Sequence, residues 1–208
     1  MSHVSEKEYV NDVYDNIADD FSRTRTRVWE HVKTFIDSVQ KDSNCIDIGC
    51  GNGKNMYRND INMIGIDMCD KFVSMCNSKD LCAYKMDCCE LSFDDDTFDN
   101  AMSIAVFHHL TTHERRIQAL SEMIRVLKPN GLGMMTLWSF ENQNKHSFIK
   151  GDNMVSWKHS ENGIVFDRYY YIFDESEVGE YLLNFKDDVN IIMKYNDRGN
   201  WYVLFQKL

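Results

Sequence analysis

The chain has 208 residues, of which 43% are hydrophobic and 27% charged, as is ordinary for one globular domain with a sizeable core. Its net charge of −10 argues against broad affinity for nucleic acids, so any RNA contact needs a local basic patch. No run of about 18 apolar residues and no apolar signal core are present, so we expect no membrane span and a cytoplasmic protein.

The predicted elements begin with two helices. Apolar residues recur at helical spacing over residues 6–20 and again over residues 28–40. Short apolar strands then follow, and further helices are expected over residues 71–77 and 112–127, the second of them closed by P-N-G. The strands are expected at residues 45–48, 63–66, 81–86, 98–104 and 132–138.

Two last strands, at residues 189–194 and 201–206, flank N-D-R-G-N, which is a hairpin signal. The alternation of strand and helix predicts an α/β, Rossmann-like, doubly wound fold over residues 1–208 as a single domain. Its sheet is expected to be mostly parallel and seven-stranded, with helices on both faces and a C-terminal antiparallel hairpin. Residues 139–167 are polar and irregular, which predicts a substrate-side excursion that reaches about residue 173.

The seven cysteines are odd in number and contain no C-x-x-C pair. This favours reduced thiols over a disulfide framework or a zinc site. We therefore expect no bound metal from the cysteines.

A glycine-rich turn, I-D-I-G-C-G-N-G-K, joins the first strand to the segment after it. Its glycines, Gly49, Gly51 and Gly53, let the backbone approach a ligand closely. A dinucleotide-binding fingerprint needs its third glycine one residue later, and the P-loop pattern does not fit. A nicotinamide oxidoreductase thus remains a distant alternative.

G-x-G-x-G after a strand, with Asp47 two residues before the first glycine, resembles the S-adenosylmethionine loop of class I methyltransferases. Asp67 ends the second strand, where a carboxylate can accept both hydroxyls of a ribose. Asp87 and Cys88 end the third strand. The resemblance implies that Asp87 accepts from the adenine amino group and that the backbone N–H of Cys88 meets a ring nitrogen.

The stretch F-H-H-L-T-T-H-E-R-R, residues 107–116, follows the fourth strand, and Ala105 at that strand's end is expected to border the cofactor. A metal site on His109 and His113 is one interpretation, but T-T before His113 predicts a helix N-cap that interrupts a shared face. His108 and His109 are expected to line the cofactor–substrate edge, or to pack the loop.

Arg115 and Arg116 lie in the first turn of the helix that follows. They are candidates for gripping an anion, or for salt bridges on the helix surface.

The same stretch resembles the tRNA wobble-uridine carboxymethyl methyltransferases, which comprise a stand-alone fungal enzyme and a domain of the animal AlkB-type tRNA hydroxylase. The N-terminal helix and the T-R after it, R-Y-Y-Y-I-F at residues 168–173 and N-D-R-G-N-W-Y-V-L-F-Q-K near the end also resemble this family. Arg25 and Trp29 match its arginine and tryptophan.

This resemblance implies methyl transfer from S-adenosylmethionine to the carboxylate of 5-carboxymethyluridine at position 34 of a tRNA anticodon loop, giving the methyl ester and S-adenosylhomocysteine. A carboxylate is ionised at neutral pH and needs no strong base, so catalysis rests on alignment. The catalytic candidates are Arg25, His108, His109, Arg168, Arg198 and Asn200. Candidates for contact with substrate or RNA are Trp29, Arg115, Arg116, Tyr169 and Trp201, of which Tyr169 and Trp201 would stack on a splayed base.

Two local basic patches offset the acidic balance. One contains Arg23, Arg25, Arg27 and Lys33, and the other contains Arg115, Arg116, Arg125 and Lys128. The resemblance also implies a small zinc-binding activator subunit at the edge of the third strand, from Leu81 to Met86, whose apolar residues need a cover.

Two other functions remain open from the sequence. One is a methyltransferase for a small metabolite, which would act on free acids without tRNA. The other is a cofactor-binding scaffold of a tRNA-modifying complex, which would bind cofactor without turnover.

Overall fold

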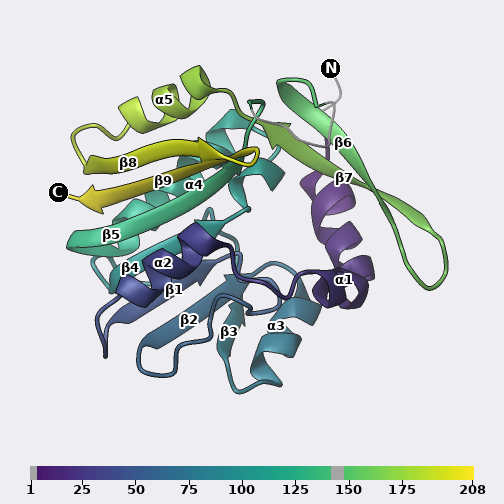
Figure 1. Cartoon of the computed structure of the whole chain (residues 1–208), viewed down its shortest axis with the longest axis horizontal. Helices are drawn as coiled ribbons and strands as arrows, with labels where there is room; N and C mark the ends of the chain where they lie inside the picture. The colour runs from purple at the N-terminus through teal and green to yellow at the C-terminus, as the bar shows by residue number, and fades with distance from the viewer. Residues whose placement is uncertain (1–3, 142–147) are drawn as a thin grey trace.

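The computed structural model describes residues 4–141 and 148–208, which contain a seven-stranded sheet in the order β3-β2-β1-β4-β5-β9-β8 (Figure 1). β1 to β5 pair in parallel, and β9 runs antiparallel to both β5 and β8. The strands are β1 Asn44–Ile48, β2 Asn62–Asp67, β3 Cys82–Lys85, β4 Phe98–Ile104, β5 Leu127–Trp138, β8 Val189–Asp197 and β9 Asn200–Lys207. The predicted fold class is confirmed.

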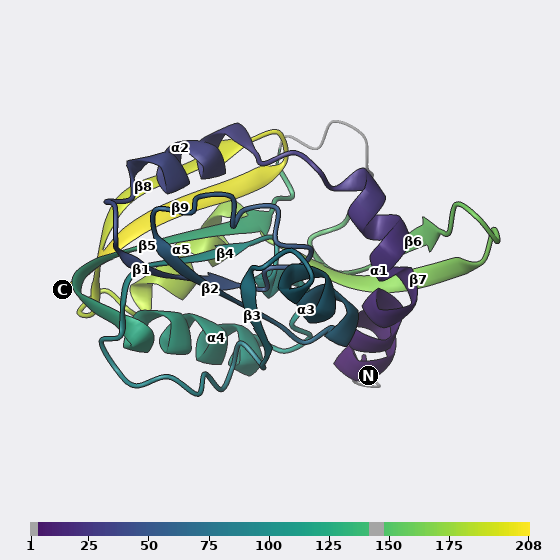
Figure 2. The same cartoon turned by 90° about the horizontal axis from the view of Figure 1, so that it is seen from below.

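Helices cover both faces of this sheet (Figure 2). α2 packs on one face, where Val32 and Ile36 meet Met102 and Met134. α4 and α5 pack on the other face. The helices are α1 Asp12–Thr24, preceded by a π-helical turn Lys7–Asn11, then α2 Glu30–Ser38, α3 Asp70–Asn77, α4 His113–Val126 and α5 Glu175–Leu183, with a 3-10 turn at Phe107–His109.

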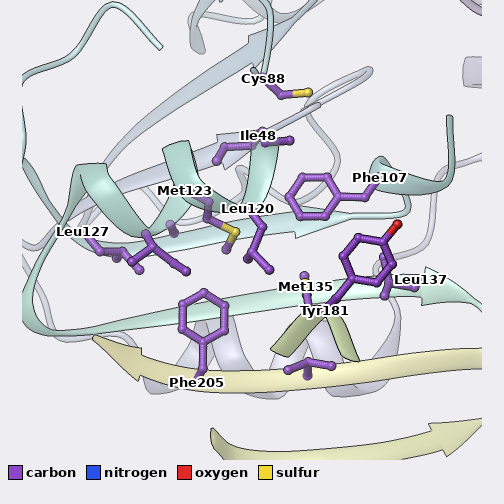
Figure 3. Packing of buried hydrophobic residues seen from close by; sticks show 14 of the residues in the cluster. Ile48, Cys88, Phe107, Leu120, Met123, Leu127, Met135, Leu137, Tyr181 and Phe205 are labelled. Carbon is purple, nitrogen blue, oxygen red and sulfur yellow. The ribbon is translucent and has the colours of Figure 1, made fainter. Parts of the chain in front are cut away.

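The largest core cluster lies between the sheet and α4 (Figure 3). Side chains alternate along the strands, so Met134 of β5 faces α2 while Met135 faces α4. Figure 3 shows Leu120 and Met123 of α4 meeting Phe205 of β9 in this cluster. Fully burying a side chain of this size contributes about 1.5–3 kcal/mol, so this face fixes the register of the central strands.

The excursion expected to be irregular contains a regular hairpin, which corrects that prediction. β6 Gly151–Lys158 pairs antiparallel with β7 Val165–Ile172, while residues 142–147 lie outside the described residues. The exposed positions of β6 alternate with half-buried ones, a pattern that mixed polar and apolar residues obscure in the sequence. The hairpin extends beside α1, away from the main sheet (Figure 2).

Helix α5 was not predicted either. It starts with a capping box, in which the Asp174 side chain accepts from Glu177 N and the Glu177 side chain accepts from Asp174 N. This D-x-x-E signal is legible in the sequence.

The turn between β8 and β9 is tight. Arg198 and Gly199 both adopt positive φ, 49° and 76°, as a two-residue hairpin turn requires. Among the described residues, no helix has the length and apolar character needed to cross a bilayer.

Candidate active site

A cavity of about 220 Å³ lies where the parallel strands end, at the edge where ligands bind in open α/β sheets. The predicted site residues that line it are Arg25, Trp29, Gly49, Gly51, Asp67, Asp87, Cys88, Ala105, His108, His109 and Arg115. They come from the loops after β1, β2, β3 and β4, from the residues around α1, and from the start of α4.

The glycine loop is fixed by backbone bonds to the neighbouring strand. The N–H groups of Gly49 and Cys50 both donate to the carbonyl of Ile66, at 2.8 and 2.9 Å. Gly49 has φ +75°, and a Cβ there would lie 2.3 Å from Val106, so no other residue fits. Gly51 has φ +54° and open space where a Cβ would be, which leaves room for a ligand against the backbone.

Asp47 is fully buried beneath this loop, and neither of its carboxylate oxygens has a hydrogen-bond partner among the described residues. Burial raises the pKa of Asp47 to about 7. Buried polar groups are nearly always paired, so this carboxylate suits a cationic ligand group. The α-ammonium group of S-adenosylmethionine fits this need.

Asp67 holds the loop from the next strand. Its oxygens accept from Gly51 N and Cys69 N, both at 2.9 Å, and burial raises its pKa to about 6. A carboxylate has about four acceptor sites, so Asp67 retains the capacity to accept two ribose hydroxyls.

Asp87 lies in an ion-pair chain that reaches the N-terminal segment. Arg115 Nη2 donates to Asp87 at 2.9 and 3.1 Å, and Arg115 Nε donates to Glu6 at 2.8 Å. Burial acts to raise the pKa of Asp87, but the Cys89 N–H and Arg115 outweigh it and hold the pKa below the usual range. Arg115 is thus already engaged by two carboxylates, which argues against the predicted anion grip.

His109 is held in one tautomer by a chain of hydrogen bonds. Arg168 Nη1 donates to the Tyr170 hydroxyl at 2.9 Å, and arginine has no acceptor, so Tyr170 donates onward to Tyr14 at 3.2 Å. Tyr14 then donates to His109 Nε2 at 3.0 Å, and His109 Nδ1–H donates to the Tyr169 carbonyl at 2.9 Å. Burial lowers the pKa of His109 to about 3, so the ring is neutral with both nitrogens occupied.

His108 differs from its neighbour. It is 1% exposed, its Nδ1 has no partner among the described residues, and burial lowers its pKa well below the usual range. Its ring stacks on Tyr170 at 5.0 Å, and Tyr170 stacks on Trp138 at 4.2 Å. Trp138 and Tyr170 also line the cavity, which gives it an aromatic wall.

Arg25 and Trp29 belong to the α1–α2 linker, residues 25–29. The Arg25 guanidinium lies over Phe21 at 5.1 Å and over Trp157 at 5.7 Å, and it makes no ion pair within the described residues. Lys54 Nζ lies 5.6 Å from the Trp29 ring. The Asn52 side chain in the glycine loop donates to the Arg25 carbonyl at 3.2 Å, which ties the linker to the cofactor loop.

Ala105 has φ +61°, an uncommon conformation for a residue other than glycine. Its N–H donates to Thr136 Oγ1 at 2.9 Å, and the residue lines the cavity. Backbone strain of this kind concentrates at functional sites, where surrounding contacts sustain it.

Several other predicted site residues lie outside the cavity lining. Gly53 packs against Leu81, and Asp47 is buried beneath the loop. Asn200 is the strand partner of Trp138 across β5 and β9, and Arg198 is 82% exposed at the hairpin turn. Arg168 is 4% exposed, behind the aromatic wall between Trp157 and Tyr170.

Three predicted RNA contacts require correction because their side chains are buried in the core. Tyr169 is 1% exposed and donates to Asp152, and Trp201 is 5% exposed within the main cluster. Neither offers a ring face to a base in the cavity. Arg116 is 5% exposed, donates to Tyr181 and lies 3.8 Å over the Tyr171 ring, so it does not grip an external anion.

Tyr14, Trp138 and Tyr170 were missed from the sequence. Tyr14 and Tyr170 are separated by 156 residues, so no local pattern reveals their contact. Trp138 ends β5 at the same sheet edge as the loops after β1 and β4. Its place at a strand end could have predicted it as a site residue.

Thr112 caps α4 as predicted, with its side chain accepting from Arg115 N at 3.2 Å, and His113 is exposed. Within the described residues, the potential metal ligands that lie together are those of Asp87, Cys88 and Cys89, within 4.8 Å of one another. His109 and His113 are not among them. Asp87 is already paired with Arg115, so this group carries no assignment here.

Comparisons with known proteins agree with this geometry. A model of the methyltransferase domain family matches residues 46–135, which span the glycine loop and the ends of β2, β3 and β4. A tRNA (carboxymethyluridine(34)-5-O)-methyltransferase of Schizosaccharomyces pombe is 33% identical, with 97% of each chain covered. The Xenopus tropicalis protein named tRNA (carboxymethyluridine(34)-5-O)-methyltransferase alkbh8 is 32% identical over 98% of this chain, which spans 41% of that longer relative.

Among solved structures, a complex between the Haloferax volcanii Trm112 methyltransferase activator and a putative methyltransferase matches with a TM-score of 0.70. The match covers 93% of this chain and 97% of that one at 17% identity, so it supports the fold alone.

Proposed function

Because the chain belongs to the tRNA (carboxymethyluridine(34)-5-O)-methyltransferase family, we propose that it methylates the carboxylate of 5-carboxymethyluridine at the wobble position of a tRNA anticodon. The whole chain serves as a single methyltransferase domain. S-adenosylmethionine supplies an electrophilic methyl group, and the products are the methyl ester and S-adenosylhomocysteine.

The observation that carries the substrate class is the uncompensated charge of Arg25. This guanidinium lines the cavity, is exposed, and makes no ion pair with a carboxylate of the described residues. Arginine binds carboxylates in a planar, bidentate geometry, so Arg25 suits the substrate carboxylate. Its contacts with the Phe21 and Trp157 rings fix the orientation of the guanidinium group.

The ionisation states of the two histidines support the same chemistry. Both are neutral, and His109 has no free lone pair, so neither is poised as a general base. A carboxylate nucleophile needs none, because it is already ionised at neutral pH. The part left to the protein is alignment, and His108 and His109 shape the pocket in which that alignment occurs.

The aromatic wall supports a role in holding the target base. Trp138 is half-buried beside the cavity, and single-stranded RNA bases usually stack on such rings. Tyr170 is 3% exposed and stacks on both His108 and Trp138, so it supports the Trp138 ring from behind. In this proposal Trp138 takes the part first expected of Tyr169 and Trp201. Arg168 positions Tyr170 and thereby His109, and it is a positioning residue.

The cofactor would be held by the residues around the glycine loop. Asp47 would attract the α-ammonium group from beneath the loop. Gly49, Gly51 and Gly53 shape the loop, and Asp67 accepts from the ribose. Asp87 and the Cys88 backbone hold the adenine, and the strained Ala105 borders the methyl group.

A small zinc-binding activator is the proposed protein partner, at the edge of β3. β3 ends the sheet and has one neighbouring strand, and Tyr84 on it is 50% exposed. The Haloferax volcanii methyltransferase of similar fold was solved with the activator Trm112. The seven free cysteines suit a cytoplasmic location.

The test is methyl transfer from labelled S-adenosylmethionine to tRNA carrying 5-carboxymethyluridine, with and without the activator, followed by nucleoside mass spectrometry. We expect the methyl ester at position 34. Arg25→Gln should lower kcat/KM by about 10- to 100-fold, since a hydrogen bond to a charged group contributes about 1.5–3 kcal/mol.

Lys33→Gln is the matched control, because Lys33 lies on the nearby α2, pairs with Asp37 and does not line the cavity. Turnover of free small acids without tRNA would replace the proposal with a metabolite methyltransferase. Cofactor binding without turnover on any RNA would replace it with the scaffold role.

A further inference from the structure

The basic side chains of this acidic protein differ in whether they are already paired. We infer that the phosphate backbone of the tRNA docks on the α1–α2 linker, through Arg27 beside the carboxylate-binding Arg25, and not on helix α4. This inference rests on the proposed function and assigns the surface through which that substrate is held.

The basic residues of α4 and the start of β5 are already paired or buried. Arg115 pairs with Glu6 and Asp87, and Arg116 is buried. Arg125 pairs with Glu122 and Asp95, and Lys128 pairs with Asp99 at 2.7 Å. A phosphate that binds there must first displace a carboxylate, and that exchange gains little.

The linker is different. Arg25 and Arg27 are both exposed, and neither makes an ion pair with a described residue. Among the described residues, Arg25 and Arg27 are the surface arginines without an ion pair. The others each have a carboxylate within 4.0 Å, namely Arg23, Arg58, Arg115, Arg125 and Arg198.

Three acidic side chains near the linker have other partners, and Glu30, at the start of α2, makes no ion pair with Arg25 or Arg27. Asp20 accepts from Arg23, Asp37 from Lys33, and Asp197 lies 3.2 Å from His31. The linker therefore carries unneutralised positive charge in a molecule whose net charge is −10.

The position of the linker fits a substrate that enters the cavity. Arg27 is two residues from Arg25 and two from Trp29, both of which line the cavity, so its Cα lies no more than about 7 Å from either. The contact between His31 and Asp197 brings the β8–β9 turn, with its exposed Arg198, to the start of α2 (Figure 2). Arg198 is 82% exposed at this turn but lies 4.0 Å from Asp197, so it is not an unpaired cation like Arg27, and it lies outside the cavity where a catalytic role was first expected.

RNA suits this surface because phosphate contacts position a nucleic acid without reading its sequence. The net charge of −10 disfavours general binding of RNA, so docking depends on local unpaired cations such as Arg27. Each phosphate neutralised releases counterions, and this gives the inference a specific signature in salt dependence.

The experiment measures binding of a fluorescent tRNA transcript to the full chain by anisotropy over a series of salt concentrations. Arg27→Gln should weaken binding several-fold and reduce the slope of log K against log[salt] by about 0.7 to 0.9, the value of one phosphate contact. Lys128→Gln is the matched control and should change neither quantity. Calorimetric titration of S-adenosylmethionine should give the same Kd for Arg27→Gln as for the wild type.

The outcomes separate the inference from the proposed function. Wild-type binding that Arg27→Gln leaves unchanged while Lys128→Gln weakens it would overturn the inference alone. The inference is also overturned if Arg27→Gln spares tRNA binding and weakens only the complex with the activator. Absence of tRNA binding by the wild type, with and without the activator, would remove the proposed function as well.

Discussion

Asp47 and Arg25 are two charged side chains without an ionic partner among the described residues, and burial distinguishes their consequences. Asp47 is fully enclosed, so its charge is costly until a cation enters. Arg25 is exposed, so water solvates its charge until a carboxylate displaces that water.

The raised pKa of Asp47 predicts a pH-dependent stability. Its pKa is about 7 in the folded protein and about 3.9 in an unfolded chain, so between these values the folded state binds the extra proton. The free energy of unfolding should therefore fall as pH rises from about 4 to about 7. Asp47→Asn cannot titrate and should gain stability relative to wild type between pH 5 and pH 8, by on the order of 4 kcal/mol at most.

Urea denaturation without cofactor at pH 5 and pH 8 measures the stability of Asp47→Asn relative to wild type. Asp12→Asn, on the surface of α1, is the control. A difference between wild type and Asp47→Asn that stays constant with pH would contradict it. Asp47→Asn should also bind S-adenosylmethionine more weakly, because the amide cannot pair with the ammonium group.

The Tyr14 hydroxyl predicts a second effect. Tyr14→Phe leaves His109 Nε2 without its donor and Tyr170 without its acceptor, which should cost about 1–3 kcal/mol in the free energy of unfolding. Tyr57→Phe removes an exposed hydroxyl and should change stability by less than about 0.5 kcal/mol. Equal effects of the two substitutions in urea denaturation would refute the hydrogen-bond chain.

At this scale the sequence predicts residues whose role follows from their place at a strand end. The three glycines, Asp67 and Asp87 come after consecutive parallel strands, so topology brings them to one edge. The hydrogen-bond chain and the burial of Tyr169 and Trp201 depend on contacts between distant segments, which no local pattern encodes.

At the scale of elements, a buried carboxylate of α1 holds the far end of the β6–β7 hairpin. Asp20 is 3% exposed and accepts from Trp157 Nε1 at 2.9 Å and from Ser160 N at 3.3 Å. Ser160, Arg23 and Trp157 lower the pKa of Asp20, so the carboxylate is ionised at neutral pH.

Asp20→Asn should therefore loosen the hairpin, because the amide nitrogen faces donors. Limited trypsin digestion should cleave after Lys158 several-fold faster than in wild type. Asp167→Asn breaks only a bond within the hairpin, to Ser156, and should leave the rate unchanged. Protection of Lys158 in Asp20→Asn would show that other contacts hold the hairpin.

The parallel strands and their helices were predictable because apolar runs of the right length alternate along the chain. The hairpin was not, because its packing is decided by α1, more than a hundred residues earlier in the sequence. Helix α5 is short, and its capping signal is the main local evidence for it.

For the molecule as a whole, the sheet has two edges that both carry exposed apolar side chains. Tyr84 on β3 is 50% exposed, and Ile192 on β8 is 48% exposed. The β8 edge is interrupted by a register shift between Ile191 and Met193, a feature that discourages pairing. β3 has no such shift against β2, which favours it as the docking edge.

Tyr84→Asp should thus weaken binding of the activator at least tenfold, about 1.4 kcal/mol, while Ile192→Asp leaves it unchanged. Co-purification and calorimetry with the activator measure this. If Ile192→Asp instead disrupts the complex, the partner occupies the opposite edge.

The number of charges in the sequence could not have predicted which basic side chains lack an ion pair, because the pairing of each cation depends on its neighbours in the folded chain.

The amide of Asn52 joins the glycine loop, where we propose that the methyl donor binds, to the linker, where we propose that the acceptor binds. Two ligands that share such a joint are thermodynamically coupled, and the coupling is reciprocal. Whatever affinity for tRNA is gained when S-adenosylmethionine orders the loop must equal the affinity for S-adenosylmethionine gained when tRNA is bound. A positive coupling would make the protein hold tRNA more weakly whenever S-adenosylmethionine is absent.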